Sequence, residues 1–155
     1  MKLQSSRILI TLLILSSLCR SSSAADHPPI TLMISGPQTI AVGDQIPIRA
    51  VFKNVSNHRI GVWLGETYTV VARDENRREL SRKPWPVDGS SGSTEIEPGS
   101  TAEDFRTDLK GLPALSRPGR YVVQFTRPLD YGDPKSPIVE SNEITIDVTL
   151  PKKEP

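Results

Sequence analysis

The stretch "RPGRYVVQFTR", residues 117–127, places a turn directly before an alternating segment. Its Pro-Gly pair at 118–119 favours a turn, and Tyr121 follows after a single arginine. Val123 and Phe125 then lie on the same face as the tyrosine. Because an alternation of period two is typical of a half-buried strand, this stretch predicts a turn that leads into a core strand.

Similar patterns recur on both sides of this stretch. Residues 45–54 ("QIPIRAVFKN") and 143–150 ("EITIDVTL") alternate clearly. Their expected inward residues are Ile46, Ile48, Ala50 and Phe52, and Ile144, Ile146, Val148 and Leu150. Other short strands are expected at 30–35, 60–65, 67–73 and 101–109. No stretch of ten residues has a helical period, so the sequence predicts an all-β antiparallel sandwich of seven or eight strands.

Two segments interrupt the strand pattern. Residues 81–100 ("SRKPWPVDGSSGSTEIEPGS") and 127–137 ("RPLDYGDPKSP") are rich in proline, glycine or serine, which break any period. Both are predicted to be long loops. Loops of this length are often functional, and they are the first places to look for a binding surface.

The positions of two aromatic residues sharpen the fold prediction. Trp63 stands in the third expected strand, and Tyr121 begins the penultimate one. An immunoglobulin-type sandwich places a buried tryptophan on its third strand and a tyrosine at the start of its sixth, where the hydroxyl bonds back to upstream backbone. We therefore expect Trp63 to be buried and Tyr121 to fix the corner.

The chain resembles the immunoglobulin-like and fibronectin-type domains of exported bacterial proteins. Three stretches carry this resemblance, "IRAVFKNVSNHRIGVWL", "IEPGSTAEDFRTDL" and "LSRPGRYVVQFTR", and it covers most of residues 30–150. The pair of inter-sheet cysteines found in antibody domains is absent, since Val123 stands two residues after Tyr121 where the second would be.

The N-terminus has the pattern of a signal peptide. Basic residues precede an apolar stretch of eleven residues, Ile8–Leu18, and the small residues "SSSAA" follow it at 21–25. Eleven apolar residues are too few to span a bilayer, which needs about 20. The sequence thus predicts a signal peptide at 1–25, one domain at 26–150 and a polar tail at 151–155.

Export predicts a secreted or periplasmic protein with no membrane span once the signal is removed. Attachment of a lipid to Cys19 is not expected, because the preceding residue is Leu18 rather than a small residue. Cleavage after residue 25 would leave a chain without cysteine, with 16 basic and 18 acidic side chains. That balance gives no electrostatic reason to expect a nucleic acid or an anionic membrane as partner.

The sequence gives no sign of catalytic equipment, and we expect neither an enzyme nor a cofactor. His58 lies in a turn beside Asn57, where nothing indicates the rigid support of a catalytic histidine. Glu95 and Glu97 would share one face of an extended segment, and a solvated face is a better interpretation of them than a paired-carboxylate site.

Metal binding is also not expected. Calcium needs six to eight oxygen ligands, and Asp88, Asp130 and Asp133 supply too few in loops that favour Asx turns. A square-planar copper or nickel chelate through His27 would form only if cleavage followed Ala24.

The motif Asn54-Val55-Ser56 fits the acceptor pattern for a glycan, which matters only if the host exports through a eukaryotic pathway. An asparagine that serves the turn is the preferred interpretation, because the composition of residues 54–59 is typical of a turn.

The best sequence candidates for binding lie in the two predicted loops. Trp85 stands between two prolines that stiffen its backbone, with Arg82 and Asp88 nearby, and Tyr131 stands in the second loop. The alternative for Trp85 is that it folds back over the open end of the sandwich. Two functions remain open: a module that binds another protein or a cell-envelope polymer, or a proteinase inhibitor or regulator acting through the 81–100 loop.

Overall fold

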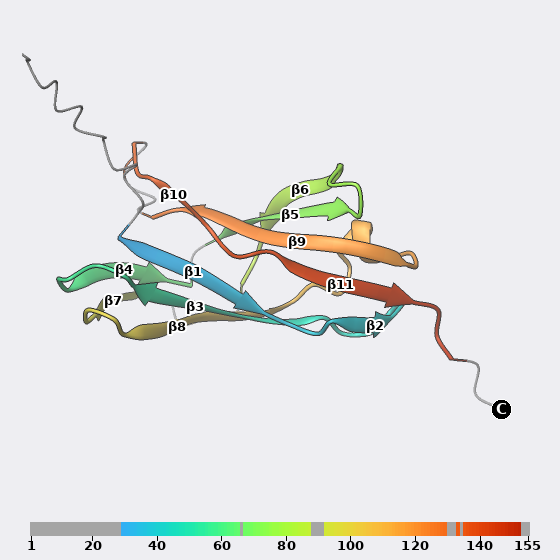
Figure 1. Ribbon diagram of the computed structural model, residues 1–155, viewed down its shortest axis with the longest axis horizontal. Helices are drawn as coiled ribbons and strands as arrows, with labels where there is room; N and C mark the ends of the chain where they lie inside the picture. Colours follow the sequence, from blue (N-terminus) through green and yellow to red (C-terminus); the bar gives the residue numbers. More distant parts are fainter. Residues whose placement is uncertain (1–28, 66, 88–91, 130–132, 134, 153–155) are drawn as a thin grey trace, which may run out of the picture.

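The computed structural model describes residues 29–65, 67–87, 92–129, 133 and 135–152 (Figure 1). These residues form eleven strands and one short 3₁₀ helix, so the predicted all-β class is confirmed. No helix in these ranges is long and apolar enough to cross a membrane. The elements are β1 (Ile30–Ser35), β2 (Thr39–Ala41), β3 (Pro47–Asn54), β4 (Ile60–Leu64), β5 (Tyr68–Asp74), β6 (Glu79–Trp85), β7 (Gly92–Ile96), β8 (Thr101–Asp108), η1 (Pro113–Leu115), β9 (Gly119–Pro128), β10 (Ile138–Glu140) and β11 (Ile144–Thr149).

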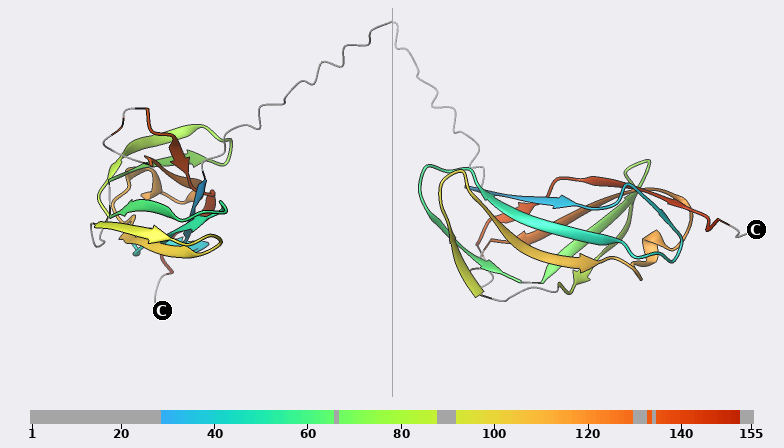
Figure 2. Two further views of the ribbon diagram at one scale, coloured as in Figure 1. Left: turned by 90° about the vertical axis from the view of Figure 1, so that its left-hand side faces the viewer. Right: turned by 90° about the horizontal axis from the view of Figure 1, so that it is seen from below.

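The strands divide between two sheets and a separate pair. The first sheet has the order β1-β3-β8, and the second has the order β2-β11-β9-β5-β6, with β10 also paired to β9. Strands β4 and β7 pair only with each other among the described strands, and they form a ribbon at one end of the molecule (Figures 1 and 2). The pairings are antiparallel except that of β2 with β11.

The core lies between the two sheets and follows the predicted alternation. Burial of every second residue in β3 is confirmed at Ile48, Ala50 and Phe52. Tyr68 of β5, Phe105 of β8 and Phe125 of β9 form an aromatic cluster, whose ring centroids are 4.6–6.0 Å apart. Aromatic side chains bury large apolar areas, so this cluster is a main contributor to the packing of the two sheets. The expected inward position of Leu150 was wrong: it is 71% exposed, because β11 ends at Thr149.

The chain enters β9 through the corner that the opening stretch predicts. The Tyr121 hydroxyl donates to the Arg117 carbonyl at 2.9 Å, which is the upstream backbone contact expected of a tyrosine at this position. A Cβ on Gly119 would lie 3.1 Å from the same hydroxyl, so the glycine leaves room for the ring. Gly119 and the hydrogen bond of Tyr121 together form the corner at which β9 starts.

The prediction of a long loop at 81–100 was wrong. Strand β6 occupies Glu79–Trp85 and β7 occupies Gly92–Ile96, which leaves a connection at 86–91. β6 is an edge strand with no fully buried residue, so its sequence has no apolar alternation. Pro84 is tolerated there because an edge strand needs only one row of hydrogen bonds. Polar edge strands, together with the separation of β1 from β2, explain why there are more strands than the seven or eight expected.

Candidate functional site

Trp63 lies on the outer face of the β4–β7 ribbon, and the expectation that it would be buried was wrong. Residues of β4 alternate, so Ile60 and Val62 point inward and are buried, whereas Gly61 and Trp63 point outward. Trp63 is 52% exposed. The apolar sequence of this strand suggested burial on both faces, but no second layer covers its outer face within the described residues.

The neighbours of Trp63 on this outer face are small. Gly61 stands two residues before it, and a Cβ at that glycine would meet nothing within 4 Å. Across the ribbon Ser93 is opposite Trp63, and Glu95 is opposite Gly61. Side chains directly opposite each other on paired strands are the ones that could cover an indole. Because a glycine and a serine occupy the adjacent positions, the indole remains open to solvent.

A polar cluster lies at the start of the ribbon, on the outer face that also carries Trp63. Arg59 donates from Nη1 to Glu95 Oε2 at 3.0 Å, and its Nη2 forms an ion pair with Glu97. Hydrogen bonding to Glu97 and the charge of that carboxylate, followed by the same effects from Glu95, raise the pKa of Arg59. All three side chains are exposed, so the cluster offers donors and acceptors to a ligand and contributes little to stability.

A buried arginine fixes the backbone that carries Trp63. Arg127 of β9 is 1% exposed, and its Nη1 donates to the Trp63 carbonyl at 2.9 Å. Its Nε donates to the Pro128 carbonyl at 2.9 Å. The guanidinium carbon lies 5.5 Å from the ring centroid of Phe52 and 5.4 Å from that of Tyr68. Arg127 therefore ties the ribbon to the end of β9 and to the aromatic core.

A buried carboxylate holds the next part of the same backbone. Asp104 of β8 is 4% exposed, and its Oδ1 accepts a hydrogen bond from the Gly65 amide at 3.0 Å. Its Oδ2 accepts from the Tyr68 hydroxyl, which also lies 3.5 Å from Arg127 Nη1. Burial, together with the negative charge of Asp104, raises the pKa of Tyr68 well above its usual value. The backbone on both sides of Leu64 is thus anchored to groups that are buried in the core.

Asn54 holds the other end of the ribbon. It is fully buried, and its Nδ2 donates to the carbonyls of His58 and Ile96, both at 2.7 Å. Its Oδ1 accepts from the Ser56 amide at 2.9 Å. The nitrogen to which a glycan would be attached is therefore occupied and enclosed in the folded chain. This geometry matches the turn interpretation of the asparagine.

Sequence reasoning did not identify Asn54, Asp104 and Arg127 as buried polar anchors. One signal was present for Arg127, because it continues the inward series of Tyr121 and Phe125 at a spacing of two. Strand parity alone places its side chain in the core.

The structure describes two of the four predicted binding residues, Trp85 and Arg82. Trp85 is partly buried at the end of β6, packs against the core and donates from Nε1 to Thr107 Oγ1 at 3.1 Å. It therefore covers the gap between β6 and β8, which corresponds to the alternative of a residue folded back onto the sandwich. Arg82 lies three residues earlier, on the other face of the strand, and pairs with Glu79 at 2.9 Å. Asp88 and Tyr131 lie outside the described residues.

Among the residues considered for catalysis or metal binding, His58 and Asp133 lie within the described part of the chain and have local partners. His58 is exposed in its turn, with Nδ1 3.3 Å from the side-chain oxygen of Asn57. Asp133 accepts a hydrogen bond from the Lys135 amide at 2.8 Å, as in an Asx turn. His27 and Asp130 lie outside the described residues. Among those that are described, no three His, Cys, Asp or Glu side chains gather in a group that could hold a metal ion.

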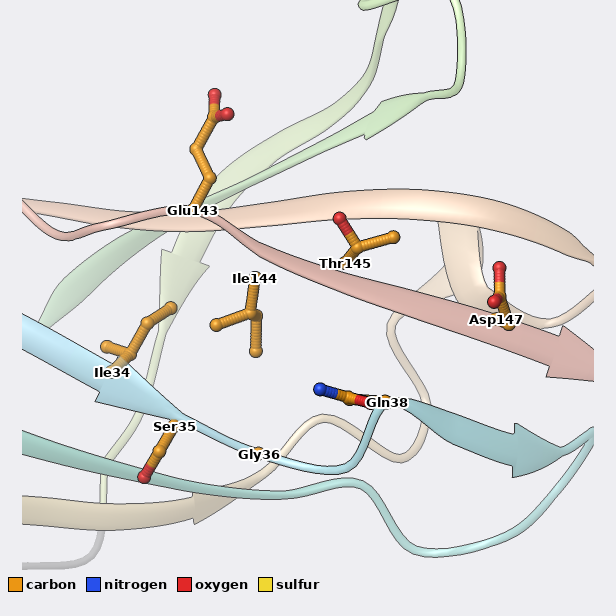
Figure 3. Close-up of a pocket in the computed structure, with 8 residues that line it drawn as sticks. All are labelled: Ile34, Ser35, Gly36, Gln38, Glu143, Ile144, Thr145 and Asp147. Atoms are coloured by element: carbon orange, nitrogen blue, oxygen red, sulfur yellow. The ribbon is translucent and has the colours of Figure 1, made fainter.

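A groove of 520 Å³ runs between β1 and β11, where the chain crosses from one sheet to the other (Figure 3). Ile34 and Ile144 lie on facing sides of it, and Gln38 points toward the space between them. Its carboxylates are engaged: Glu143 pairs with Arg73 and Arg77, and Asp147 pairs with Arg120. The groove could accommodate an extended segment, but its acidic groups already have partners.

No protein-family model matches the chain, and no curated protein matches it. Similar folds do occur among solved structures. The CARDB domain of the PF1109 protein from Pyrococcus furiosus, an immunoglobulin-like fold, is 15% identical with a TM-score of 0.45, and the match covers 79% of this chain and 96% of that domain.

Two other similar structures are larger proteins. The alkylpurine DNA glycosylase AlkC from Pseudomonas fluorescens, bound to DNA with an abasic site analog, is 11% identical with a TM-score of 0.45, and the match covers 77% of this chain and 30% of that one. A β-glucosidase from Listeria innocua is 13% identical with a TM-score of 0.40, and the match covers 78% and 16% respectively. Similarity at this level concerns the fold class and does not assign an activity.

Proposed function

We propose that this chain is a non-catalytic interaction module, secreted or periplasmic, that contacts its partner through the outer face of the β4–β7 ribbon. One observation carries the proposal: a half-exposed tryptophan stands on a backbone that buried Arg127 and Asp104 hold in place. Tryptophan and arginine are among the residue types that most often contribute a large share of the binding energy at an interface. Trp63 and Arg59 supply both on this face.

The anchoring supports the proposal through its effect on binding entropy. When a surface becomes ordered only on binding, part of the favourable interaction energy is offset by the entropy lost in ordering it, and a preformed surface avoids this cost. Hydrogen bonds to the Trp63 carbonyl and the Gly65 amide order this segment before any partner arrives. An exposed indole elsewhere in a mobile segment would not have this advantage.

The inhibitor alternative receives no support from the structure. The described part of 81–100 offers no projecting loop, since Glu79–Trp85 pairs with β5 and Trp85 packs against the core, and residues 88–91 lie outside the described residues.

The test is a crosslinking capture from the envelope and medium of the organism that makes the protein. Wild type is compared with Trp63→Ala, and with Leu80→Ala as a matched loss of an exposed apolar side chain on β6. We expect one partner, protein or polymer, to be captured by wild type and Leu80→Ala and lost with Trp63→Ala. Equal capture by all three proteins would place the binding surface elsewhere and contradict the proposal.

A further inference from the structure

The surroundings of Trp63 restrict the chemistry of its partner. A protein interface normally has an apolar core several residues wide, with polar groups at its rim. The described outer face of the ribbon instead carries one large apolar side chain, Trp63, beside Gly61 and Ser93. A single indole with polar neighbours matches a ligand that has a small apolar face and polar edges.

A pyranose ring has this chemistry. One face of such a ring presents carbon-bound hydrogens that pack on an aromatic surface, and its edge presents hydroxyl groups that both donate and accept. The bare backbone at Gly61 leaves space beside the indole for a flat ring, since nothing lies within 4 Å of a Cβ there. Glu95 lies across the ribbon from that glycine, and its carboxylate pairs with the guanidinium of Arg59, which stands two residues before the glycine on the other strand. Both side chains are exposed.

The local charge distinguishes between classes of glycan. The polar cluster at the start of the ribbon has one positive side chain, Arg59, and two negative ones, Glu95 and Glu97. Both carboxylates are paired with the arginine, so the described cluster offers no unopposed positive charge to an anionic chain. Like charges placed together across an interface are unfavourable, which disfavours polyanions such as uronic acid or phosphate-bearing polymers.

We propose that the ligand of the β4–β7 ribbon is an uncharged glycan chain that runs along its outer face, with one pyranose ring stacked on Trp63 and the hydroxyl groups of this and neighbouring rings bonded to Glu95 and Arg59. This inference rests on the proposed function and specifies its partner. It concerns the same surface and makes no use of the groove between β1 and β11.

The experiment uses the full chain with Trp85→Phe, so that Trp63 is the only tryptophan and its emission reports the ribbon alone. The probes are hexasaccharides of β-1,4-glucose, β-1,3-glucose, β-1,4-N-acetylglucosamine and β-1,4-mannose. At least one is expected to shift the emission to shorter wavelength and to saturate. Titration calorimetry with the same probe should show binding to the parent protein and a loss of at least about tenfold with Trp63→Ala.

A second variant tests the shape of the surface without removing the indole. Gly61→Thr places a branched side chain beside Trp63, and we expect it to weaken binding by about tenfold while the urea midpoint stays within error of the parent. The binding constant should be the same at low salt and at about 0.5 M NaCl, because exposed charges are largely screened there and stacking is not.

Three results would overturn the glycan assignment: no hexasaccharide of the panel binds, binding survives Trp63→Ala, or binding disappears at high salt. The capture experiment separates this failure from failure of the proposed function. If a protein partner is lost with Trp63→Ala and no glycan binds, the interaction module stands and only its ligand class is wrong. If nothing depends on Trp63 in either experiment, both proposals fail.

Discussion

Arg127 is the residue on which the described site most depends. A buried guanidinium is costly to remove from water, and here it is accommodated by backbone carbonyls, including those of Trp63 and Pro128, and by the Tyr68 hydroxyl near Asp104. Removal of one member of such a network leaves the others buried without the group that balanced them. The cost of substitution is therefore set by the groups that remain.

We expect Arg127→Met to lower the free energy of unfolding by about 3–5 kcal/mol, because Asp104 keeps its charge and three carbonyls lose their donor. Arg127→Lys should be intermediate, since an ammonium keeps the charge without the planar fork. Urea unfolding monitored by circular dichroism measures both. Arg120→Ala, which breaks an exposed pair with Asp147, serves as the control and should leave the midpoint unchanged. A midpoint for Arg127→Met equal to that control would contradict the role given to the network.

Single residues were predictable where their environment is local. The contact of Tyr121 is made four residues upstream, so the turn and the strand pattern were enough to expect it. Trp63 was not predictable in this way, because its exposure depends on what packs over β4. The core aromatic that sequence reasoning assigned to Trp63 is instead Tyr68, on the next strand, which contacts Phe105 and Phe125.

At the scale of elements, the crossing between β1 and β2 shows how the two sheets are joined. β1 pairs with β3 in one sheet and β2 pairs with β11 in the other, so the chain changes sheets at residues 36–38. The Asn142 side chain bridges both backbone groups of Ile34 at the end of β1, which completes the hydrogen bonding there. Close packing at this crossing requires Gly36.

Gly36→Ala is expected to destabilise the protein by about 1–2 kcal/mol. The new Cβ would lie 2.5 Å from Ile48 Cδ1 and 3.2 Å from the Pro47 carbonyl, and Ile48 is buried, so the core must adjust. Gly61→Ala is the matched control, because its Cβ would meet nothing within 4 Å. Urea midpoints compare the two variants, and equal midpoints would show that the crossing has more room than the structure indicates.

A strand was predictable from the sequence when one of its faces is buried along the whole strand, because its apolar residues then alternate with polar ones. β3 and β9 alternate, and their inward residues are confirmed at Ile48, Phe52 and Phe125. β6 and β7 were not predicted because β6 has no buried residue and β7 buries only Ile96, so neither sequence shows an apolar alternation. The site was missed because Trp63, on the strand that was predicted at 60–65, was assigned to the core.

At the scale of the whole molecule, the buried Tyr68 hydroxyl links stability to alkaline pH. Burial and the nearby Asp104 raise the pKa of Tyr68 in the folded state, whereas in the unfolded chain it is close to the usual value of about 10. At a pH between these two pKa values, the Tyr68 hydroxyl has lost its proton in the unfolded chain and keeps it in the folded chain. The unfolded state is then favoured as pH rises.

We expect the free energy of unfolding to be insensitive to this group below pH of about 9 and to fall above about 10, by up to about 1.4 kcal/mol for each pH unit. Urea unfolding between about pH 8 and 11.5 measures this slope. Tyr68→Phe should be less stable throughout, because it loses the hydrogen bond to Asp104, and its slope above pH 10 should be shallower. Equal slopes for the two proteins would contradict the raised pKa.

The parallel pairing of β2 with β11 has a consequence for how the chain reaches this state. Strand β2 pairs with residues 147–149, so the second sheet cannot close until the chain has been synthesised at least as far as residue 149. Contacts between distant parts of a sequence slow folding, and unpaired strands are exposed to aggregation meanwhile. A nascent chain shorter than this leaves β2 and the edge of its sheet unpaired, and it is the form of this domain most open to aggregation.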